Sequence, residues 1–338
     1  MRLGIDCRGA LSDELLRSGR QLGATDAITG GAALARARKD AGPPYLEYDE
    51  LAQARARVEA AGMKLHAIEN LPFAWYGDLF YGGPQRQQQL ENWQQTLRSM
   101  GRAGIPILGY CLMEGSAGRY STRTNLEAGG RGGARVSHYD HERLDDPTTT
   151  ARATWPERKN RAPLSAAQML QNIEEFLGAV LPVAAASGVK MALHPDDPPV
   201  PSIHGLPRLA SSHAGLRRLL ELVPSDHHGL DFCQGTIAEM DEDVYEAIRY
   251  FGARGKIFYV HFRNVSGSVP DFSESFIDDG YVDMARAMRL YRQAGVDVPL
   301  IEDHVPHLSD DDEHQNRSRA FAIGYIKALL DSSAGEAS

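Results

Sequence analysis

Eight short strand-like runs alternate with helical patterns along this chain of 338 residues. The last five runs are apolar without strict alternation, which is typical of strands covered on both faces. The eight runs are RLGIDCR (2–8), AIT (27–29), LHAIEN (65–70), IPILGYC (105–111), KMALHP (190–195), HGLDFC (228–233), KIFYVHF (256–262) and VPLIED (298–303). Strands that alternate with helices form parallel βα units, so we predict an α/β fold, a closed (β/α)8 TIM barrel. A doubly wound open sheet is the competing architecture.

Helical periodicity fills the stretches between these runs. The segments that carry it are 48–62, 85–104, 164–188, 241–252, 281–295 and 318–330. In the second segment Leu90, Trp93, Leu97 and Met100 recur at helical spacing, and such a stripe usually packs into a core. Ser165 stands where the third helix should begin, and serine is a favourable N-cap residue.

One long stretch interrupts the alternation. Residues 112–164 are rich in Gly, Arg and Ser and show little periodicity. Because they follow the fourth strand, they would lie at the C-terminal face of the barrel, where active sites of this fold are found. We predict an insertion without secondary structure that acts as a lid or substrate-binding loop; a disordered insertion is the alternative. Residues 1–330, this loop included, are predicted to form a single TIM-barrel domain, with 331–338 as a flexible tail.

Composition and charge restrict the class of protein. Hydrophobic residues make up 42% of the chain and charged residues 24%, an ordinary globular composition. The net charge of −9 without a basic stripe argues against nucleic-acid binding. Three scattered cysteines predict a reduced, intracellular compartment. No signal peptide and no run of about 20 apolar residues is apparent, so we expect a cytoplasmic protein that does not bind membranes.

Four potential metal ligands stand at the ends of four apolar runs. They are His194, Cys233, His261 and Asp303, spaced 39, 28 and 42 residues apart. Singly, each has an ordinary structural explanation, since a histidine or cysteine at a strand end is more often a packed or hydrogen-bonded residue. Together they occupy the same position in successive βα units, whose strand ends converge on one face of a barrel. Two imidazoles, a thiolate and a carboxylate suit a divalent transition metal, which indicates a metal-dependent enzyme.

Neighbouring residues extend this candidate site. Asp196 and Asp197 follow His194 and are predicted to orient an imidazole ligand or, for Asp196, to contact the substrate. A helix cap or a solvated acidic pair is the alternative. Arg263 lies two residues after His261, so in an extended strand both side chains point the same way. An arginine there suits the carboxylate of a substrate.

These motifs resemble a known family over most of the chain. The resemblance is carried by ARVEAAGMKLHAIENLP, NWQQTLRSMGRAGIPILGY, STRTNL, FLGAVLPVAAASGVKMALHPDDPP, GLPR, VHFRNV, YVDM and EDH. The chain is similar to the mannonate dehydratases, metal-dependent sugar-acid dehydratases of the xylose-isomerase-like barrel superfamily. The combination of HPDDPP with GLPR is highly specific to them.

The resemblance implies a function and a site. Such enzymes bind Mn²⁺ or Fe²⁺ and convert D-mannonate to 2-keto-3-deoxy-D-gluconate, a step of hexuronate degradation. It implies the same four metal ligands that the spacing gives. It also implies proton transfer by His304, and Arg263 and Arg123 near the substrate. By analogy, a homo-oligomer, dimer or tetramer, is expected.

Departures from the family pattern fall around the acid and base residues. The family has Arg-Pro before its Asp-His and Gly after it, where this chain has IEDHV (301–305). A later family stretch begins with a tyrosine thought to be catalytic, and EHQNRSRA places His314 there. The family loop MPVFDWTRTDL and the N-terminal Arg-Trp-Tyr-Gly also differ. These changes suggest a divergent member.

The resemblance therefore implies β-elimination of water from an aldonate, in which a metal would stabilise the enediolate. His304 would transfer the C2 proton, and His314 or Tyr120 would protonate the departing hydroxyl. A metal-dependent sugar isomerase or epimerase is the first alternative, favoured by the altered acid and base motifs. A non-catalytic metal-binding or sugar-sensing protein is the second. The acidic charge argues against a phosphodiester nuclease.

Overall fold

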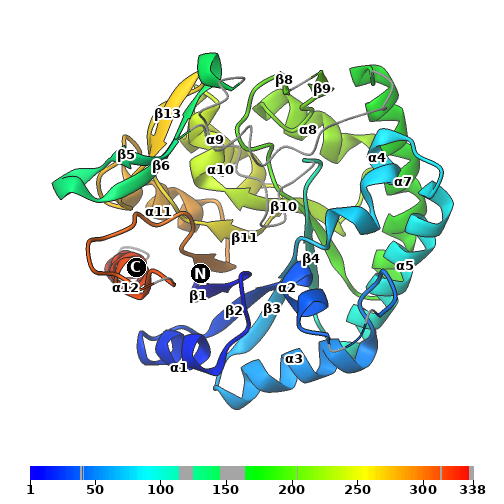
Figure 1. The fold of residues 1–338 in the computed structure, drawn as a ribbon, viewed down its shortest axis with the longest axis horizontal. Coiled ribbons are helices and arrows are strands. Elements are labelled where there is room, and N and C mark those ends of the chain that lie inside the picture. The colour runs from blue at the N-terminus through cyan, green and yellow to red at the C-terminus, as the bar shows by residue number, and fades with distance from the viewer. Residues whose placement is uncertain are drawn as a thin grey trace.

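A closed barrel of eight parallel strands forms the centre of the molecule (Figure 1). The computed structural model describes residues 1–38, 40, 42–113, 125–144, 164–203, 205–312 and 314–334. The barrel strands are β1 (Arg2–Cys7), β2 (Asp26–Gly30), β3 (Lys64–Glu69), β4 (Ile107–Tyr110), β7 (Lys190–Leu193), β10 (His228–Cys233), β11 (Ile257–His261) and β14 (Pro299–Ile301). Their order is β1-β14-β11-β10-β7-β4-β3-β2, and β1 also pairs with β2. All eight predicted strands are confirmed, and closure excludes the open sheet.

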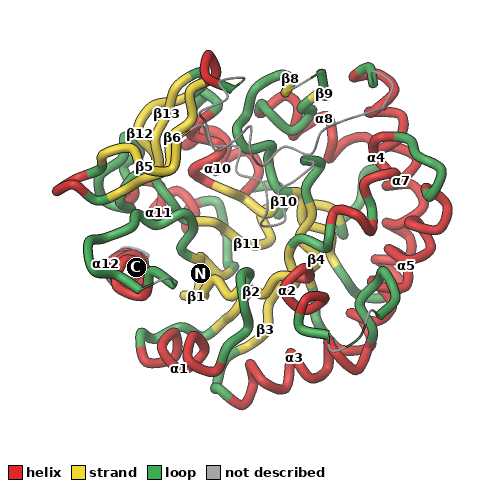
Figure 2. Tube along the Cα trace, in the orientation of Figure 1, coloured by secondary structure: helices red, strands yellow, loops and turns green. Residues whose placement is uncertain are grey.

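Helices surround this barrel on its outside (Figure 2). They are α1 (Asp13–Gln21), α2 (Gly31–Arg36), α3 (Tyr48–Ala60), α4 (Gly77–Tyr81), α5 (Arg86–Ala103), α7 (Ala166–Ala186), α8 (His213–Leu222), α9 (Gln234–Glu239), α10 (Val244–Gly252), α11 (Met284–Gln293) and α12 (Asn316–Ala334). Three short 3-10 turns are η1 (Phe73–Trp75), η2 (Arg131–Gly133) and η3 (His141–Arg143). Each predicted helical segment coincides with a helix, although α12 extends beyond both ends of 318–330. Ser165 caps α7 as predicted, since its hydroxyl accepts a hydrogen bond from the Gln168 N–H.

Two layers of apolar side chains stabilise the barrel. The larger layer lies between strands and helices and includes Trp93, Leu97 and Met100 of α5, all at most 2% exposed. A second cluster draws on six of the barrel strands, as expected for residues that fill the interior: Ile28, Ala67, Ile107, Ala192, Phe258, Tyr259 and Ile301. Burying one large apolar side chain contributes roughly 1.5–3 kcal/mol, so both layers hold the strand ends in fixed positions.

An antiparallel sheet lies outside the barrel and corrects one prediction. Its order is β12 (Val265–Ser268), β13 (Asp271–Glu274), β6 (Arg135–Asp140) and β5 (Asn125–Gly129). The prediction of no secondary structure is therefore wrong for β5 and β6. Because β6 pairs with β13, which is more than 100 residues away in the sequence, local sequence periodicity does not predict the pairing. Residues 114–124 and 145–163 of the predicted lid lie outside the described residues. A small ribbon, β8 (Ser202–Ile203) and β9 (Leu206–Pro207), completes the strands.

The C-terminal helix extends further than predicted. α12 continues through Asp331 to Ala334, so the predicted flexible tail is wrong for 331–334. The Ser333 hydroxyl accepts a hydrogen bond from Arg292 Nε at 2.7 Å, which fixes the end of α12 against α11. α12 lies beside β1, so the last described helix contacts the first strand of the barrel (Figure 1). Among the described helices, none combines the length and apolar character that crossing a membrane requires.

Candidate metal centre

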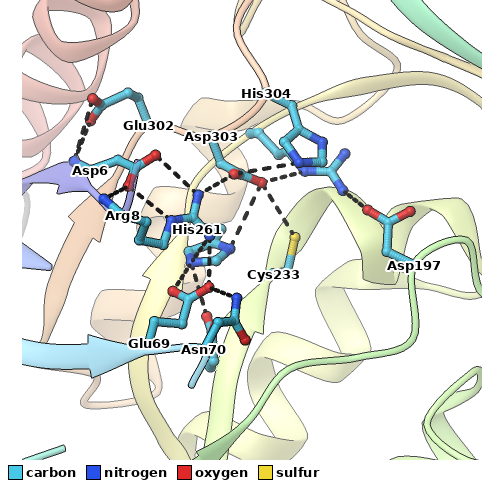
Figure 3. A network of polar contacts seen from close by, with 12 residues as sticks. Asp6, Arg8, Glu69, Asn70, Asp197, Cys233, His261, Glu302, Asp303 and His304 are labelled. Atoms are coloured by element: carbon cyan, nitrogen blue, oxygen red, sulfur yellow. Dashed lines mark hydrogen bonds and ion pairs between the residues drawn. The ribbon is translucent and has the colours of Figure 1, made fainter. Parts of the chain in front are cut away.

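Three of the predicted ligands meet at the C-terminal end of the barrel. His194 follows β7, while Cys233 and His261 end β10 and β11 and stand directly opposite each other in the sheet. Their candidate ligand atoms all lie within 4.8 Å of one another, and all three residues are buried. Asp303, two residues after β14, brings Oδ2 to 3.8 Å from His261 Nδ1 and 4.0 Å from Cys233 Sγ (Figure 3). The barrel thus brings together all four residues predicted from their spacing.

The protonation chemistry of these side chains fits a divalent transition metal. Burial alone would raise the pKa of Cys233, but the Arg263 guanidinium and the neighbouring imidazoles of His194 and His261 bring it well below its ordinary value. A thiolate is the form that binds metals. The His194 Nδ1 atom lies 2.6 Å from the Pro195 carbonyl oxygen, which leaves Nε2 as a ligand. His261 Nδ1 is buried without a hydrogen-bond partner among the described residues. A free lone pair beside a thiolate and a carboxylate is what a bound cation would use.

Asp303 lies between two guanidinium groups. Arg8 Nη2 donates to Oδ1, and Arg263 Nε lies 2.9 Å from Oδ2. Burial opposes ionisation of Asp303, but His304, Arg8, His261 and Arg263 together hold its pKa well below the ordinary value. The carboxylate is therefore available in its charged form, which a metal ligand needs.

Arg263 offers no accessible donor to a substrate. The side chain is 3% exposed, its two terminal nitrogens form hydrogen bonds, and its buried Nε forms an ion pair but no hydrogen bond. Nη1 contacts Glu239 and Glu274, Nη2 contacts Asp197 and Thr236, and Nε contacts Asp303, all at 2.8–3.0 Å. The predicted contact with a substrate carboxylate would require one of these bonds to break. In this geometry Arg263 instead orients the ligand Asp303.

A cavity lined by the candidate ligand Asp303 also contains the predicted proton-transfer residue. The cavity measures about 360 Å³, within the usual range for small-molecule sites, and Asp303, His304, Arg8, Asn70 and Arg319 are among its lining residues. His304 has a left-handed backbone, with φ of 45°, and its side chain is 43% exposed. Its Nδ1 lies 2.7 Å from Glu274 Oε1. Burial lowers the pKa of His304, but Asp303 and Glu274 outweigh it and raise the pKa above the ordinary value.

Comparison with known proteins decides the family. The model of the D-mannonate dehydratase (UxuA) family matches residues 20–337. The chain belongs to this family. It is 33% identical over 265 residues to mannonate dehydratase 2 of Halalkalibacterium halodurans, covering 73% of this chain and 75% of the relative. It is 28% identical over 289 residues to the mannonate dehydratase of Thermotoga maritima, covering 76% and 77%.

Solved structures agree with this assignment. The mannonate dehydratase of Streptococcus suis serotype 2 superposes with a TM-score of 0.86 and 26% identity, covering all of this chain and 96% of that one. An L-ribulose 3-epimerase, with a TM-score of 0.59 and 17% identity over 99% and 96% of the two chains, shares the fold alone. The family is divalent-metal dependent, and its members are hydro-lyases. The predicted family, barrel fold and lyase class are confirmed.

The two aspartates after His194 have other partners than predicted. Asp196 is 1% exposed, and its Oδ2 accepts a hydrogen bond from the Ala210 N–H at 2.7 Å. Asp197 contacts Arg263 at 3.0 Å. The Pro195 carbonyl oxygen lies 2.6 Å from His194 Nδ1, so the backbone holds this nitrogen of His194. That the aspartates orient an adjacent imidazole stays a prediction. A contact between Asp196 and the substrate stays a prediction.

Of the remaining predicted site residues, one is exposed before α12 and two lie outside the described residues. His314 is exposed in the turn before α12, where its backbone N–H donates to Asp312 Oδ1 at 2.9 Å. Among the described residues that line the cavity, it is absent. Arg123 and Tyr120 lie outside the described residues. The roles of all three stay predictions.

Sequence reasoning missed a group of charged residues beneath the ligands. Glu69 and Asp231, both fully buried, place carboxylate oxygens 3.1 and 3.3 Å from His261 Nε2. Arg8 joins them through Glu69. A signal did exist for two of them. Glu69 is the last residue but one of the apolar run LHAIEN, and Asp231 precedes Cys233 by two residues, on the same face of its strand.

Proposed function

We propose that this enzyme removes water from D-mannonate to give 2-keto-3-deoxy-D-gluconate. The observation that carries this proposal is the meeting of His194, Cys233, His261 and Asp303, together with a cavity that Asp303 and His304 both line. These four residues would hold the divalent ion, for which we propose Mn²⁺ or Fe²⁺. When bound, such an ion supplies a Lewis acid that lowers the barrier to removing a proton beside a carboxylate.

His304 is the proposed proton-transfer residue. Its Nδ1 contact with Glu274 fixes the ring and leaves Nε2 to exchange a proton with the substrate. The elimination takes the C2 proton and the C3 hydroxyl, and the resulting enol becomes the 2-keto product by gaining a proton at C3. Arg8 and Arg263 support the reaction indirectly, since they hold Asp303 in place and keep it ionised.

The substrate class, the oligomeric state and the location of the enzyme are proposed from the family relationship. A small sugar acid is the proposed substrate, and neither a nucleic acid nor a membrane is a proposed partner. We also propose a homo-oligomer, a dimer or tetramer, and a cytoplasmic location. Measuring the molecular mass of the purified enzyme in solution would test the proposed oligomeric state.

The reaction is tested by incubating the purified enzyme with Mn²⁺ and D-mannonate in D₂O. We expect a product lighter than the substrate by one water, with one deuterium at C3 because the final proton comes from solvent. Enzyme treated with a chelator is the control and should form no product. A sugar isomerase or epimerase would instead give a product of unchanged composition, and that result with aldoses, ketoses or aldonates would contradict dehydration.

A further inference from the structure

Glu69 contacts four side chains beneath the candidate ligands. It is the last residue of β3 and is fully buried. Its Oε1 accepts hydrogen bonds from Arg8 Nη1 at 2.8 Å and Asn70 Nδ2 at 3.0 Å. Its Oε2 accepts one from the Tyr259 hydroxyl at 3.2 Å and lies 3.1 Å from His261 Nε2 (Figure 3). Both oxygens are therefore fixed in position.

Glu69 contacts the candidate ligand His261 directly. Carboxylate oxygens of Glu69 and Asp231 lie 3.1 and 3.3 Å from His261 Nε2, so this nitrogen carries the hydrogen. Arg8 Nη1 is also 3.3 Å away, but it already donates to Glu69. With the hydrogen on Nε2, the lone pair is on Nδ1, the nitrogen 3.8 Å from Asp303 Oδ2. A carboxylate that fixes the tautomer of a histidine in this way increases its strength as a metal ligand.

Glu69 is connected to a second candidate ligand, Asp303, through Arg8. One terminal nitrogen of Arg8 donates to Glu69, and the other donates to Asp303 Oδ1. Asp6 accepts hydrogen bonds from Arg8 Nε at 2.9 Å and from Arg8 Nη2 at 3.2 Å, which fixes the guanidinium group from a third side. Because the guanidinium is planar and rigid, the position of Glu69 determines where Arg8 meets Asp303.

We propose that Glu69 is a positioning residue for two of the four ligands, orienting His261 directly and Asp303 through Arg8. This inference rests on the proposed metal site and adds a residue from a strand that supplies none of the ligands. A buried carboxylate that only paired with Arg8 would need no contact with a ligand imidazole. Glu69 has both contacts.

The test is the Mn²⁺ affinity of the Glu69→Gln variant, measured by competition with a chelator. Glutamine keeps the size of the side chain but loses the charge and one acceptor. We expect the dissociation constant for Mn²⁺ to rise roughly 10- to 100-fold, the effect typical of residues that orient metal ligands. In Co²⁺-loaded protein the thiolate-to-metal absorption band should also change, which a purely structural role would not cause.

Asp26→Asn is the matched control. Asp26 is 1% exposed at the start of β2, at the other end of the barrel. The variant loses the charge of a partly buried ion pair, which Asp26 forms with Arg2 Nε at 3.1 Å. Both variants should unfold at a lower temperature in the metal-free form, but Asp26→Asn should bind Mn²⁺ as tightly as the unaltered enzyme. Unchanged affinity in Glu69→Gln, or an equal loss in both variants, would overturn the inference. If the unaltered enzyme binds neither Mn²⁺ nor Co²⁺, the proposed function fails together with it.

The route through Arg8 is tested by a double-mutant cycle. If Glu69 acts on Asp303 through Arg8, the losses of Mn²⁺ affinity in Glu69→Gln and Arg8→Gln should not multiply in the double variant. Losses that multiply fully would mean that the two residues act independently, and the indirect half of the inference would be wrong.

Discussion

Replacing Cys233 with serine should lower the rate of D-mannonate dehydration about 1,000-fold, because a bound metal contributes several kcal/mol and each 1.36 kcal/mol is a factor of ten. Serine is close in size, but its hydroxyl does not ionise near neutral pH and is a poor ligand for a transition metal. The pKa of the Cys233 thiol, by contrast, is brought well below its ordinary value by Arg263, His194 and His261 against the effect of burial. Steady-state kinetics and the metal content of the purified variant are the measurements.

Cys111→Ser provides the comparison for this variant. Cys111 is also buried, but its contacts are with the Tyr76 hydroxyl at 3.7 Å and the Met113 carbonyl at 3.8 Å. It should retain both metal and activity, with at most a lower unfolding temperature. A Cys233→Ser enzyme that keeps a full metal content and normal turnover would remove the thiolate from the proposed site.

Replacing His304 with asparagine should lower kcat by roughly 10²- to 10⁴-fold, the usual contribution of a positioned proton-transfer group. The bound metal should remain, since His304 is outside the proposed ligand set. Asparagine suits this position structurally, because it tolerates the left-handed backbone that His304 adopts at φ 45°. The loss can then be assigned to the imidazole and not to a rearranged chain.

His227→Asn is the control for a histidine replacement. His227 precedes β10 at the other end of the barrel, where its Nδ1 lies 2.9 Å from the Val189 carbonyl oxygen. Its kcat should match that of the unaltered enzyme. Near-normal turnover of D-mannonate by His304→Asn would show that another group transfers the proton, and His314 or Tyr120 would become the next candidate.

The barrel and the candidate ligands could be predicted because their signals are local and repeated. Each strand is a short apolar run between helical stretches, and even the weakest, 27–29, belongs to a five-residue strand. His194, Cys233, His261 and Asp303 all stand where such runs end. In a parallel barrel, equivalent positions along the strands converge in space, so spacing alone was sufficient to bring them together.

The partners of these residues could not be predicted in the same way. Whether Arg263 faces a substrate or four carboxylates depends on Glu239 and Glu274, which approach it from other parts of the chain. The contact of Glu69 with His261 joins strands 192 residues apart in the sequence. The pairing of β6 with β13 is equally remote. Such contacts depend on tertiary packing, which hydrophobic periodicity does not describe.

The most direct measurement is a crystal structure of the Mn²⁺-loaded enzyme with anomalous scattering data. A single Mn²⁺ peak should lie about 2–2.5 Å from atoms of His194, Cys233, His261 and Asp303, as ordinary metal–ligand distances require. A peak at another group, such as Asp197, Glu274 and His304, or no peak in a fully active crystal, would contradict the four-residue site on which the proposed reaction depends.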